Sequence, residues 1–395
     1  MPGWIGADPA RAPRRRWLTA LHHQRRRVPA TDAKGSAHMS ANATLNRFTD
    51  FMVGPARFAN LLSCFELGLI DVLRKCGGQT AVQLGETVGA TPDAVEQLLH
   101  LLVKEGFVAQ DETTGGYRLD ALAEVAPADL QRVLTLMDMI KMTMLRQVFY
   151  LTESVQTGTL VGLSELYGFQ GGTLYDAVAV HQDLRMSWST LMDNVTAHID
   201  PWFFENITIP AGARVLDVAG NTGLGAILTH KLKGSAGLHV TTFDLPEKEQ
   251  ESLANFASHG LEDRCSFVGG DVFKTLPTGY DVVMIKHFLD MWDKAEVRKI
   301  LRAVHDSLKD GGQVHILVPV YPENTRDSAS VDIDFFPAFF LGCTMGQGGP
   351  QKLSTYCDLL RECGFEVTAT VTQDPAKLLP GTFVVHGILS AKKTS

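Results

Sequence analysis

Three aspartates stand at an even spacing in the second half of this chain. Asp217, Asp244 and Asp271 are each 27 residues apart, close to the length of one strand–helix repeat of a parallel sheet. Each follows a short apolar run, so all three are predicted at the carboxyl ends of successive strands. Carboxylates at that edge of a sheet can accept hydrogen bonds from the hydroxyl groups of a nucleoside.

The first aspartate begins the turn Asp217-Val-Ala-Gly-Asn-Thr-Gly223, in which Gly220 and Gly223 let the backbone approach a ligand closely. The spacing differs from the dinucleotide fingerprint G-x-G-x-x-G, and no Gly-Lys-Ser/Thr follows to hold a phosphate. We therefore expect a nucleoside without a pyrophosphate, and S-adenosylmethionine is the common one. Each piece alone also suits an ordinary turn, but three acids in register argue against that interpretation.

Seven short apolar segments are predicted to be the strands that carry these turns. Helical segments separate most of them, and such alternation is typical of an α/β fold with a parallel sheet. The predicted strands are residues 214–218, 239–243, 265–269, 282–285, 314–318, 366–371 and 383–389.

Helical periodicity dominates the segment before the sheet, where apolar residues recur at i, i+3, i+4 and i+7 between Phe58 and Leu73. Helices over 81–88 and 92–105, followed by a hairpin, are typical of a winged helix. Residues 93–105 carry three acids and one lysine, the wrong balance for a helix that reads DNA. We expect an association domain instead, with the apolar stripe 61–73 buried against the partner subunit of a homodimer.

The composition limits the function classes. With 395 residues, 45% of them apolar, the chain can bury a core in each of two domains. A net charge of −8 argues against general nucleic-acid binding, and no apolar run is long enough to cross a membrane. The six cysteines form no Cys-x-x-Cys pair, which suits reduced residues in a cytoplasmic protein.

Four regions are expected along the chain. Residues 1–38 hold seven Arg and one Lys against two Asp, so residues 1–42 are interpreted as a basic disordered extension, although a transit peptide would also be basic. Residues 43–124 are the winged-helix domain, and 125–205 are a helical connector that roofs the substrate site. Residues 206–395 are the nucleoside-binding domain.

Several motifs together resemble a known family. Over about residues 45–392 the chain is similar to the two-domain, dimeric small-molecule O-methyltransferases of plant and actinobacterial secondary metabolism, which use S-adenosyl-L-methionine. The resemblance implies a Rossmann-like class I methyltransferase domain behind an N-terminal α-helical winged-helix dimerisation domain. The motifs are Leu67-Gly-Leu-Ile-Asp-Val-Leu73, Phe243-Asp-Leu-Pro246, Gly270-Asp-Val-Phe273, Ile285-Lys-His-Phe-Leu-Asp-Met-Trp-Asp293 and Lys309-Asp-Gly-Gly312.

The resemblance also implies how the cofactor is held. Gly220 would back the methionine moiety, and Asp244 would hold the ribose. Asp271 and Phe273 would hold and stack the adenine, and Lys286 would contact it from the fourth strand. The other cofactor-contacting positions that it implies are Asp217, Gly223, Leu245 and Val272.

The catalytic positions of the family are changed in this chain. Where O-methylating members have a histidine base in Leu-His-Asp-Trp, this chain has Asp290, and the two supporting glutamates are replaced by Val318 and Gln351. An aspartate of ordinary pKa, about 3.9, is a poor base for a phenol. A carbon nucleophile or an amine needs less of a base. Carbon or nitrogen methylation is therefore favoured, with Asp290 or His287 as the candidate proton acceptor.

Three alternatives stay open: oxygen methylation with a relocated base, a cyclase or lyase that keeps the cofactor for its charge, and a ligand-sensing regulator. A metal site is not expected, because Asp290-Met291 replaces the His-Asp pair with which some members hold a metal. The acceptor is expected to be a small aromatic or enolisable metabolite. Candidate pocket residues, which could equally be plain core, are Tyr167, Met186, Trp188, Met192, Phe335, Phe336, Phe339, Phe340, Met345 and Gln351.

Overall fold

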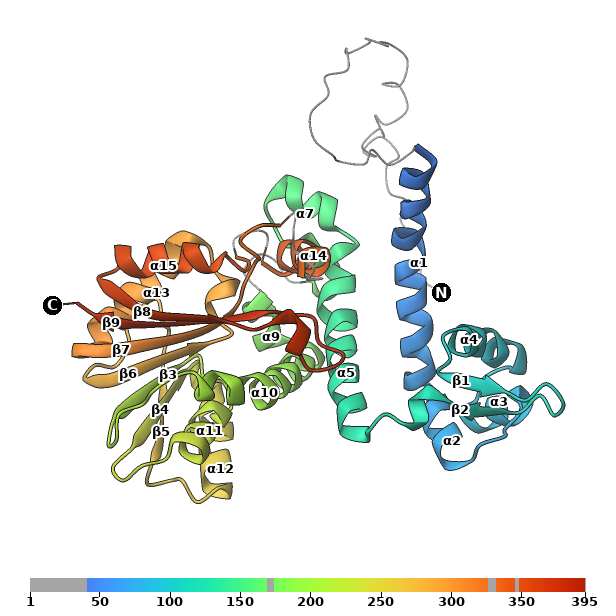
Figure 1. The fold of residues 1–395 in the computed structure, drawn as a ribbon, viewed down its shortest axis with the longest axis horizontal. Helices are drawn as coiled ribbons and strands as arrows, with labels where there is room; N and C mark the ends of the chain where they lie inside the picture. Colours follow the sequence, from blue (N-terminus) through green and yellow to red (C-terminus); the bar gives the residue numbers. More distant parts are fainter. Residues whose placement is uncertain (1–40, 169–173, 326–331, 345–347, 395) are drawn as a thin grey trace, which may run out of the picture. The chain divides into compact units, whose positions relative to one another are not determined.

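The computed structural model describes residues 41–168, 174–325, 332–344 and 348–394 (Figure 1). The chain divides into two compact units, residues 1–60 and 61–395. The described part of the first unit is helical and belongs to α1 (Ala41–Glu66). Four large apolar side chains of this segment are more than half exposed: Leu45, Phe48, Phe51 and Met52.

The predicted winged helix is confirmed in the second unit. Thr80 and Thr91 cap its second and third helices by accepting hydrogen bonds from backbone N–H groups of the first turn, and Pro92 occupies the first helical position after Thr91. The elements are α2 (Leu69–Lys75), α3 (Ala81–Val88), α4 (Pro92–Lys104) and an antiparallel hairpin of β1 (Val108–Gln110) and β2 (Tyr117–Leu119).

The apolar stripe 61–73 has a different role from the one predicted. Leu69, Ile70 and Leu73 are almost fully buried within the chain itself, where they share a core with Leu99 and Tyr117. These side chains are therefore unavailable to a partner subunit, and that prediction was wrong for them. Periodicity identifies a buried face of a helix but does not say what covers it.

Residues 127–205 are mostly helical, and one segment, Ile140–Leu145, is a π-helix. Such segments are frequent at functional sites. The last helix is the long α10 (Gln182–Glu205), which packs against α5 (Pro127–Met139), α9 (Leu174–Val180) and α11 (Leu224–Lys233). The shorter helices are α5 (Pro127–Met139), α6 (Arg146–Val148), α7 (Leu151–Thr157), α8 (Val161–Tyr167) and α9 (Leu174–Val180).

A seven-stranded sheet carries the C-terminal part, in the order β5-β4-β3-β6-β7-β9-β8. Neighbouring strands are parallel except at β9, which is antiparallel to both β7 and β8. The strand order reverses at β3, the switch point where doubly wound sheets bind ligands. The strands are β3 (Arg214–Val218), β4 (His239–Asp244), β5 (Cys265–Gly269), β6 (Tyr280–Lys286), β7 (Leu308–Pro319), β8 (Phe365–Thr372) and β9 (His386–Lys393).

Each predicted strand is present, which confirms the α/β class. The last one begins at His386 rather than at residue 383. Of the three residues before it, Phe383 and Val384 line a cavity instead of pairing in the sheet. A strand end is hard to place from sequence, because an apolar side chain suits a cavity wall as well as a sheet.

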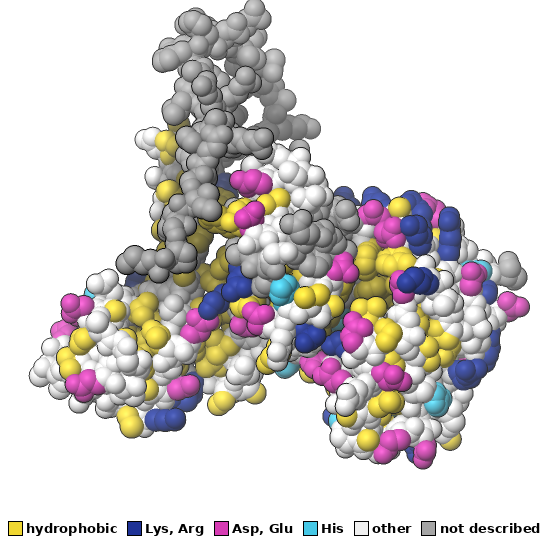
Figure 2. All heavy atoms as spheres, turned by 180° about the vertical axis from the view of Figure 1, so that it is seen from behind, with side chains coloured by type: hydrophobic (Ala, Val, Ile, Leu, Met, Phe, Trp, Pro, Cys, Tyr) yellow, Lys and Arg dark blue, Asp and Glu magenta, His cyan; other side chains and the backbone are white. Residues whose placement is uncertain are grey.

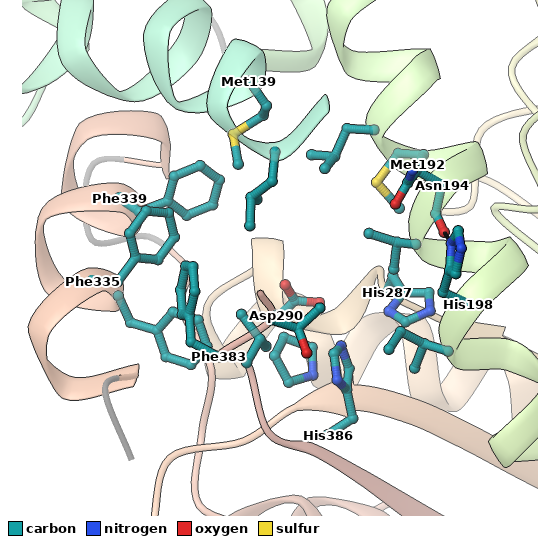
Figure 3. A pocket seen from close by; sticks show the side chains of 18 of the residues that line it. Met139, Met192, Asn194, His198, His287, Asp290, Phe335, Phe339, Phe383 and His386 are labelled. Carbon is teal, nitrogen blue, oxygen red and sulfur yellow. Dashed lines mark hydrogen bonds between the residues drawn. The ribbon is translucent and has the colours of Figure 1, made fainter. Parts of the chain in front are cut away.

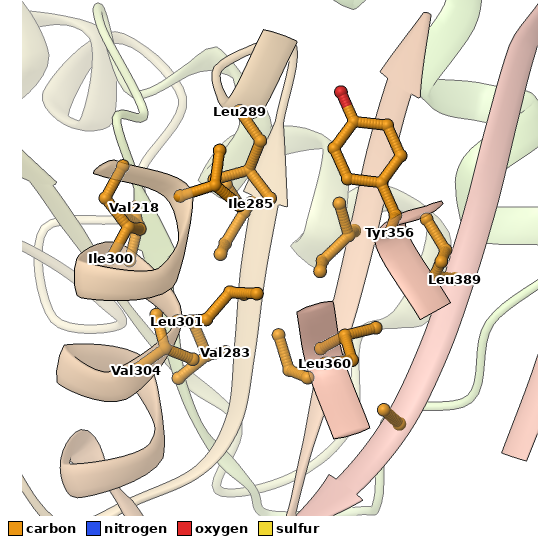
Figure 4. Packing of buried hydrophobic residues seen from close by; sticks show 14 of the residues in the cluster. Val218, Val283, Ile285, Leu289, Ile300, Leu301, Val304, Tyr356, Leu360 and Leu389 are labelled. Carbon is orange, nitrogen blue, oxygen red and sulfur yellow. The ribbon is translucent and has the colours of Figure 1, made fainter. Parts of the chain in front are cut away.

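Helices cover both faces of the sheet (Figure 1). On one face α13 (Lys294–Ser307) and α15 (Leu353–Glu362) pack against the strands through residues such as Ile300 and Leu360 (Figure 4). On the other face α10, α11 and α12 (Glu249–Ser258) form a second core with the strands. One further helix, α14 (Asp332–Thr344), contributes aromatic side chains to a third cluster beside α5 and α10. The result is a three-layer arrangement with the sheet in the middle.

Acidic and basic side chains are mixed on the face of the molecule that Figure 2 shows. Helix α4, which would read DNA in a nucleic-acid-binding winged helix, carries Asp93, Glu96 and Lys104. A nucleic-acid-binding surface needs a basic face instead. Among the described residues, no helix is both long and apolar enough to cross a membrane.

Candidate active site

A cavity of about 410 Å³ lies at the carboxyl ends of β3, β4 and β5 and beside the end of β6. Its remaining walls come from α9, α10 and the segment after β6. The position is the switch point of the sheet, and the volume suits a ligand of nucleoside size. Residues at or just beyond the strand ends that line it are Val218, Ala219, Asn221, Phe243, Asp244, Leu245, Gly270, Asp271, Val272 and Phe273.

The half-buried carboxylate of Asp244 ends β4 and lines this cavity. One oxygen accepts a hydrogen bond from the N–H of Asn221 at 2.7 Å, and the other accepts one from the N–H of Leu245 at 2.7 Å. Burial raises the pKa of this carboxyl, and the two backbone donors oppose that shift. Since a carboxylate oxygen can accept two bonds, each keeps an acceptor site for a hydroxyl group of a ligand.

The backbone around the cavity is strained. Ala219, Asn221 and His287 have φ of 57°, 49° and 52°, and they are the non-glycine residues with positive φ in the described part of the chain. All three line the cavity. Such conformations cost on the order of 1–3 kcal/mol each and cluster at binding and catalytic sites. The strain therefore supports a functional role for this edge of the sheet.

The two glycines of the turn after β3, Gly220 and Gly223, pack against neighbouring side chains and do not line the cavity. A Cβ on Gly220 would lie 2.7 Å from Cγ2 of Thr242, and one on Gly223, which has φ of 79°, would lie 2.5 Å from the ring of Phe256. These glycines therefore permit close packing between the turn and its neighbours. Their predicted contact with the ligand stays a prediction.

Asp217 and Lys286, both predicted to contact the cofactor, pair with each other instead. Their side chains form a buried ion pair, and neither residue lines the cavity. Burial raises the pKa of Asp217, against the opposing effect of Lys286. A Cβ on Gly225 would lie 2.5 Å from Oδ2 of Asp217 and 2.7 Å from Nζ of Lys286. The pair thus joins β3, β6 and the start of α11 beneath the cavity.

An aromatic wall closes one side of the cavity. Phe273 meets Trp292 edge to face with ring centroids 4.7 Å apart, and Trp292 stacks on Tyr175 at 5.9 Å. Nε1 of Trp292 is buried and has no hydrogen-bond partner among the described residues. Asp271 accepts a hydrogen bond from the N–H of Phe273 at 2.9 Å, which holds its carboxylate beside this wall. A flat ligand with polar edges, such as adenine, suits such a wall.

A second cavity, of about 160 Å³, shares Trp188, Met192 and His287 with the first, so the two cavities meet at a common wall. In Figure 3, Phe335 and Phe339 lie on one side of it and Met192 and His287 on the other. Most of its lining is apolar. The contributing elements are α5, α10, α14, the segment after β6 and the residues just before β9.

Asp290 lies in the short helix Leu289–Met291 after β6 and lines the second cavity (Figure 3). It is buried, and its Oδ1 has no hydrogen-bond partner in the described part of the chain. Burial raises its pKa to about 6, and the nearby His287 acts in the opposite direction. A carboxyl group with that pKa accepts a proton near neutral pH more readily than an ordinary aspartate does.

His287 follows β6, and its Nε2 lies 3.0 Å from Oδ1 of Asp200 on α10. Asp200 is fully buried, and its other oxygen has no partner among the residues described. The ring of His386 meets that of His287 edge to face at 5.3 Å, and burial holds the pKa of His386 well below its usual value. When Nε2 of His287 donates to the carboxylate, Nδ1 is the nitrogen that can accept a proton.

Comparisons with known proteins agree with this geometry. A model of the O-methyltransferase domain matches residues 149–366, more than half of the chain, and a model of the O-methyltransferase dimerisation domain matches residues 50–128. The chain belongs to the O-methyltransferase domain family. Members of that family depend on S-adenosylmethionine. The solved structure of human N-acetylserotonin methyltransferase contains S-adenosylmethionine, and it matches this chain with a TM-score of 0.71 at 19% identity. This chain is therefore a methyltransferase that uses S-adenosylmethionine.

Relatives of this methyltransferase come from secondary metabolism. The mitomycin biosynthesis 6-O-methyltransferase of Streptomyces lavendulae is 26% identical over 86% of this chain and 92% of that protein. The L-tyrosine C(3)-methyltransferase of the same organism is 24% identical over 87% and 91%. The solved structure of the mitomycin 7-O-methyltransferase MmcR shares the fold, with a TM-score of 0.73 at 24% identity over 89% of this chain and 98% of that one.

Most residues predicted for the acceptor pocket of this methyltransferase line the second cavity: Trp188, Met192, Phe335, Phe336, Phe339 and Phe340. Met186 does not, because its side chain points to solvent and is 60% exposed. The side chain of Gln351 donates to the carbonyl of Gly349 at 3.0 Å and lines neither cavity. The side chain of Tyr167, and Met345, lie outside what the structure describes.

Sequence reasoning missed four charged or titratable residues of the site. Asp200 and His198 reach it from α10, His386 from β9 and Arg132 from α5, each far along the chain from His287. No local motif marks them, because only the packing of distant elements brings them together. Within the described ranges, no group of three or more His, Cys, Asp or Glu is arranged to hold a metal ion.

Proposed function

We propose that this methyltransferase methylates a carbon of a small, single-ring aromatic metabolite that carries an ionisable hydroxyl group. The observation that carries the proposal is that two proton-accepting side chains, His287 and Asp290, line one acceptor cavity. A homodimer is the proposed working form, supported by the match to the dimerisation domain over residues 50–128.

S-adenosylmethionine supplies the methyl group on a positively charged sulfur. In the proposed site, Asp244 would hold the ribose hydroxyls, and Asp271, Phe273 and Trp292 would hold the adenine. The free acceptor sites of Asp244 and the unpartnered Nε1 of Trp292 support this assignment. The wall shared by the two cavities would keep the acceptor next to the cofactor, and such positioning supplies much of the rate enhancement in transfer reactions.

Methylation of a ring carbon beside a hydroxyl group involves two proton removals, one from the hydroxyl and one from the carbon, whereas methylation of oxygen involves one. His287, oriented by Asp200, would take the proton of the ring hydroxyl, which makes the neighbouring ring carbon electron-rich. Once that carbon has gained a methyl group, its own hydrogen must leave as a proton, and Asp290 would accept it. The hydroxyl then regains its proton from His287. In sum, the sulfur–methyl bond of the donor and one ring C–H bond would break, one carbon–carbon bond would form, and S-adenosylhomocysteine and one proton would leave.

The size and lining of the acceptor cavity support a one-ring molecule. A cavity of about 150 Å³ lined by Leu, Ile and Phe holds benzene, and this cavity has about 160 Å³ with a similar lining. Two relatives are named for one-ring substrates, 3-amino-4-hydroxybenzoate and L-tyrosine. The cavity therefore favours an acceptor of that size.

Oxygen methylation is the second candidate. Most named relatives are O-methyltransferases, and His287 with Asp200 has the arrangement of a relocated base. Nitrogen methylation would likewise need only one proton acceptor.

A labelled methyl donor distinguishes these reactions. The protein would be incubated with S-adenosylmethionine carrying a carbon-13 methyl group and with one-ring aromatics bearing hydroxyl or amino groups. Mass spectrometry detects S-adenosylhomocysteine and the product, and carbon-13 NMR shows whether the methyl group is on carbon, nitrogen or oxygen. A methyl group on oxygen alone would replace the proposal by the second candidate. Product without S-adenosylhomocysteine would indicate a cyclase or lyase.

A further inference from the structure

Helix α5 brings a buried arginine to the acceptor cavity. Arg132, Leu136 and Met139 lie at i, i+4 and i+7 on α5, and all three line the cavity. The side chain of Arg132 is only 4% exposed. Arg132 is the only lysine or arginine among the described residues that line this cavity. A buried guanidinium destabilises a protein unless its charge and its N–H groups are paired.

Arg132 is only partly paired within the chain. Its Nη2 donates to the carbonyl of Pro380 at 2.6 Å and lies 3.4 Å from Oδ1 of Asp129, whose side chain is 66% exposed. Its Nε and Nη1 are buried and have no hydrogen-bond partner in the described residues. An exposed carboxylate compensates a buried charge weakly, because solvent screens it. Unused donors and uncompensated positive charge therefore remain at the cavity wall.

We propose that Arg132 binds a carboxylate group of the acceptor, so that the substrate class is a one-ring aromatic acid. This inference rests on the proposed function only in that the second cavity holds the acceptor. A carboxylate is the smallest common organic anion that can accept charge-assisted hydrogen bonds from a guanidinium, and a cavity of about 160 Å³ leaves little room beyond a ring and such a group.

Arg132 and the two proposed proton acceptors reach the cavity from different elements of the chain. Arg132 is held on α5 by the carbonyl of Pro380, whereas His287 and Asp290 follow β6. An acceptor bound at both ends would thus have its carboxylate on one side of the ring and its ionisable group on another. This arrangement fixes which ring position faces the shared wall.

Two matched probes test the inference. The full chain, saturated with S-adenosylhomocysteine, would be titrated with benzoate and with benzamide in a calorimeter. Both probes have the ring, and only benzoate has the charge. We expect benzoate to bind about tenfold more tightly, the effect of one hydrogen-bonded charge pair. That difference should vanish in Arg132→Met and in Arg132→Gln.

A control variant and a folding check complete the test. Arg298→Met removes an arginine of α13 that pairs with Glu362 and lines neither cavity, so the preference for benzoate should persist. The affinity of each variant for S-adenosylhomocysteine reports whether it is folded. The inference is overturned if the natural protein binds benzoate and benzamide equally well, or if it binds neither. A benzoate preference that persists in both neutral variants overturns it too.

Probe binding also separates this inference from the proposed function, because it needs no methyl transfer. A benzoate preference that depends on Arg132 stands even when the labelled methyl group is found on oxygen. Conversely, methylation of a ring carbon in neutral phenols, with no preference for benzoate, keeps the proposed function and removes the role of Arg132.

Discussion

The two cavities of the catalytic domain are built in different ways. The larger one takes many of its polar lining residues from strand ends and turns within residues 218–273, and backbone N–H groups such as that of Asn221 hold the carboxylate of Asp244 in place. The smaller one, proposed to hold the acceptor and called the acceptor cavity, is made mainly of apolar side chains from segments as far apart as α5, α14 and the residues before β9. Backbone contacts fix one ligand, whereas side chains can change from one protein to the next. A family with one cofactor and many acceptors needs both kinds of cavity.

Replacing His287 is expected to have the largest effect, because this residue belongs to both cavities. His287→Ala should lower kcat by about 10²- to 10⁴-fold, the usual contribution of a general base. Its affinity for S-adenosylhomocysteine should change far less, because Asp244 is untouched. Turnover by mass spectrometry and binding by calorimetry measure the two effects. His259→Ala, on the exposed end of α12, is the control. If His287→Ala kept the kcat of the natural protein, the general base would be another residue.

The next largest effect should fall on the cofactor cavity alone. Asp244→Ala removes the acceptor proposed for two ribose hydroxyls, and hydrogen bonds to a charged group are worth about 1.5–3 kcal/mol each. We expect affinity for S-adenosylhomocysteine to fall by about 100-fold. Benzoate binding to the acceptor cavity should persist, which would sharpen the distinction between the cavities. Asp358→Ala, at an exposed position on α15, is the control. Unchanged cofactor affinity would remove Asp244 from the site.

The position of the larger cavity, proposed to hold the cofactor, could be predicted from the sequence because many of its residues are local. Asp244 and Asp271 follow apolar strands at a regular spacing, so their register places them at one edge of the sheet. Asp217 and Lys286 share that pattern, but burial turns them toward each other, and only side-chain packing decides this. The acceptor cavity depends on the packing of distant helices. Its aromatic run on α14 was recognisable, whereas Arg132 and Asp200 had no sequence signal.

The pH dependence of turnover tests the role of Asp290. As a proton acceptor it must be ionised, and its pKa is raised to about 6. Turnover should therefore rise as pH increases through about 6. Asp290→Asn should lower turnover about tenfold, at the low end of what a general base contributes, and remove the ionisation of this carboxyl from the profile, while that of His287 remains. A pH profile of kcat for both proteins checks this. An unchanged profile in the variant would leave Asp290 with no part in proton transfer.

The same carboxyl should also affect stability. Its pKa is higher in the folded protein than the ordinary value of about 3.9. The folded state therefore binds the proton more tightly, and the free energy of unfolding should fall as pH rises from about 4 to about 6. At pH 7 the Asp290→Asn variant should be more stable by on the order of 2 kcal/mol. Urea unfolding of both proteins at pH 4 and pH 7 measures this difference. If Asp290→Asn were no more stable than the natural protein at pH 7, the burial of a charged Asp290 would be contradicted.

The smallest effect expected separates two methionines of α10. Met192 lies in the wall shared by both cavities, whereas Met186 is 60% exposed and lines neither. Met192→Ala should weaken benzoate binding by about fivefold, since it removes apolar contact worth about 1 kcal/mol. Met186→Ala should leave binding unchanged, as most exposed substitutions do. The two residues share a helix and a chemistry, so only their surroundings differ. Equal effects in the two variants would mean that the wall between the cavities is not where α10 places it.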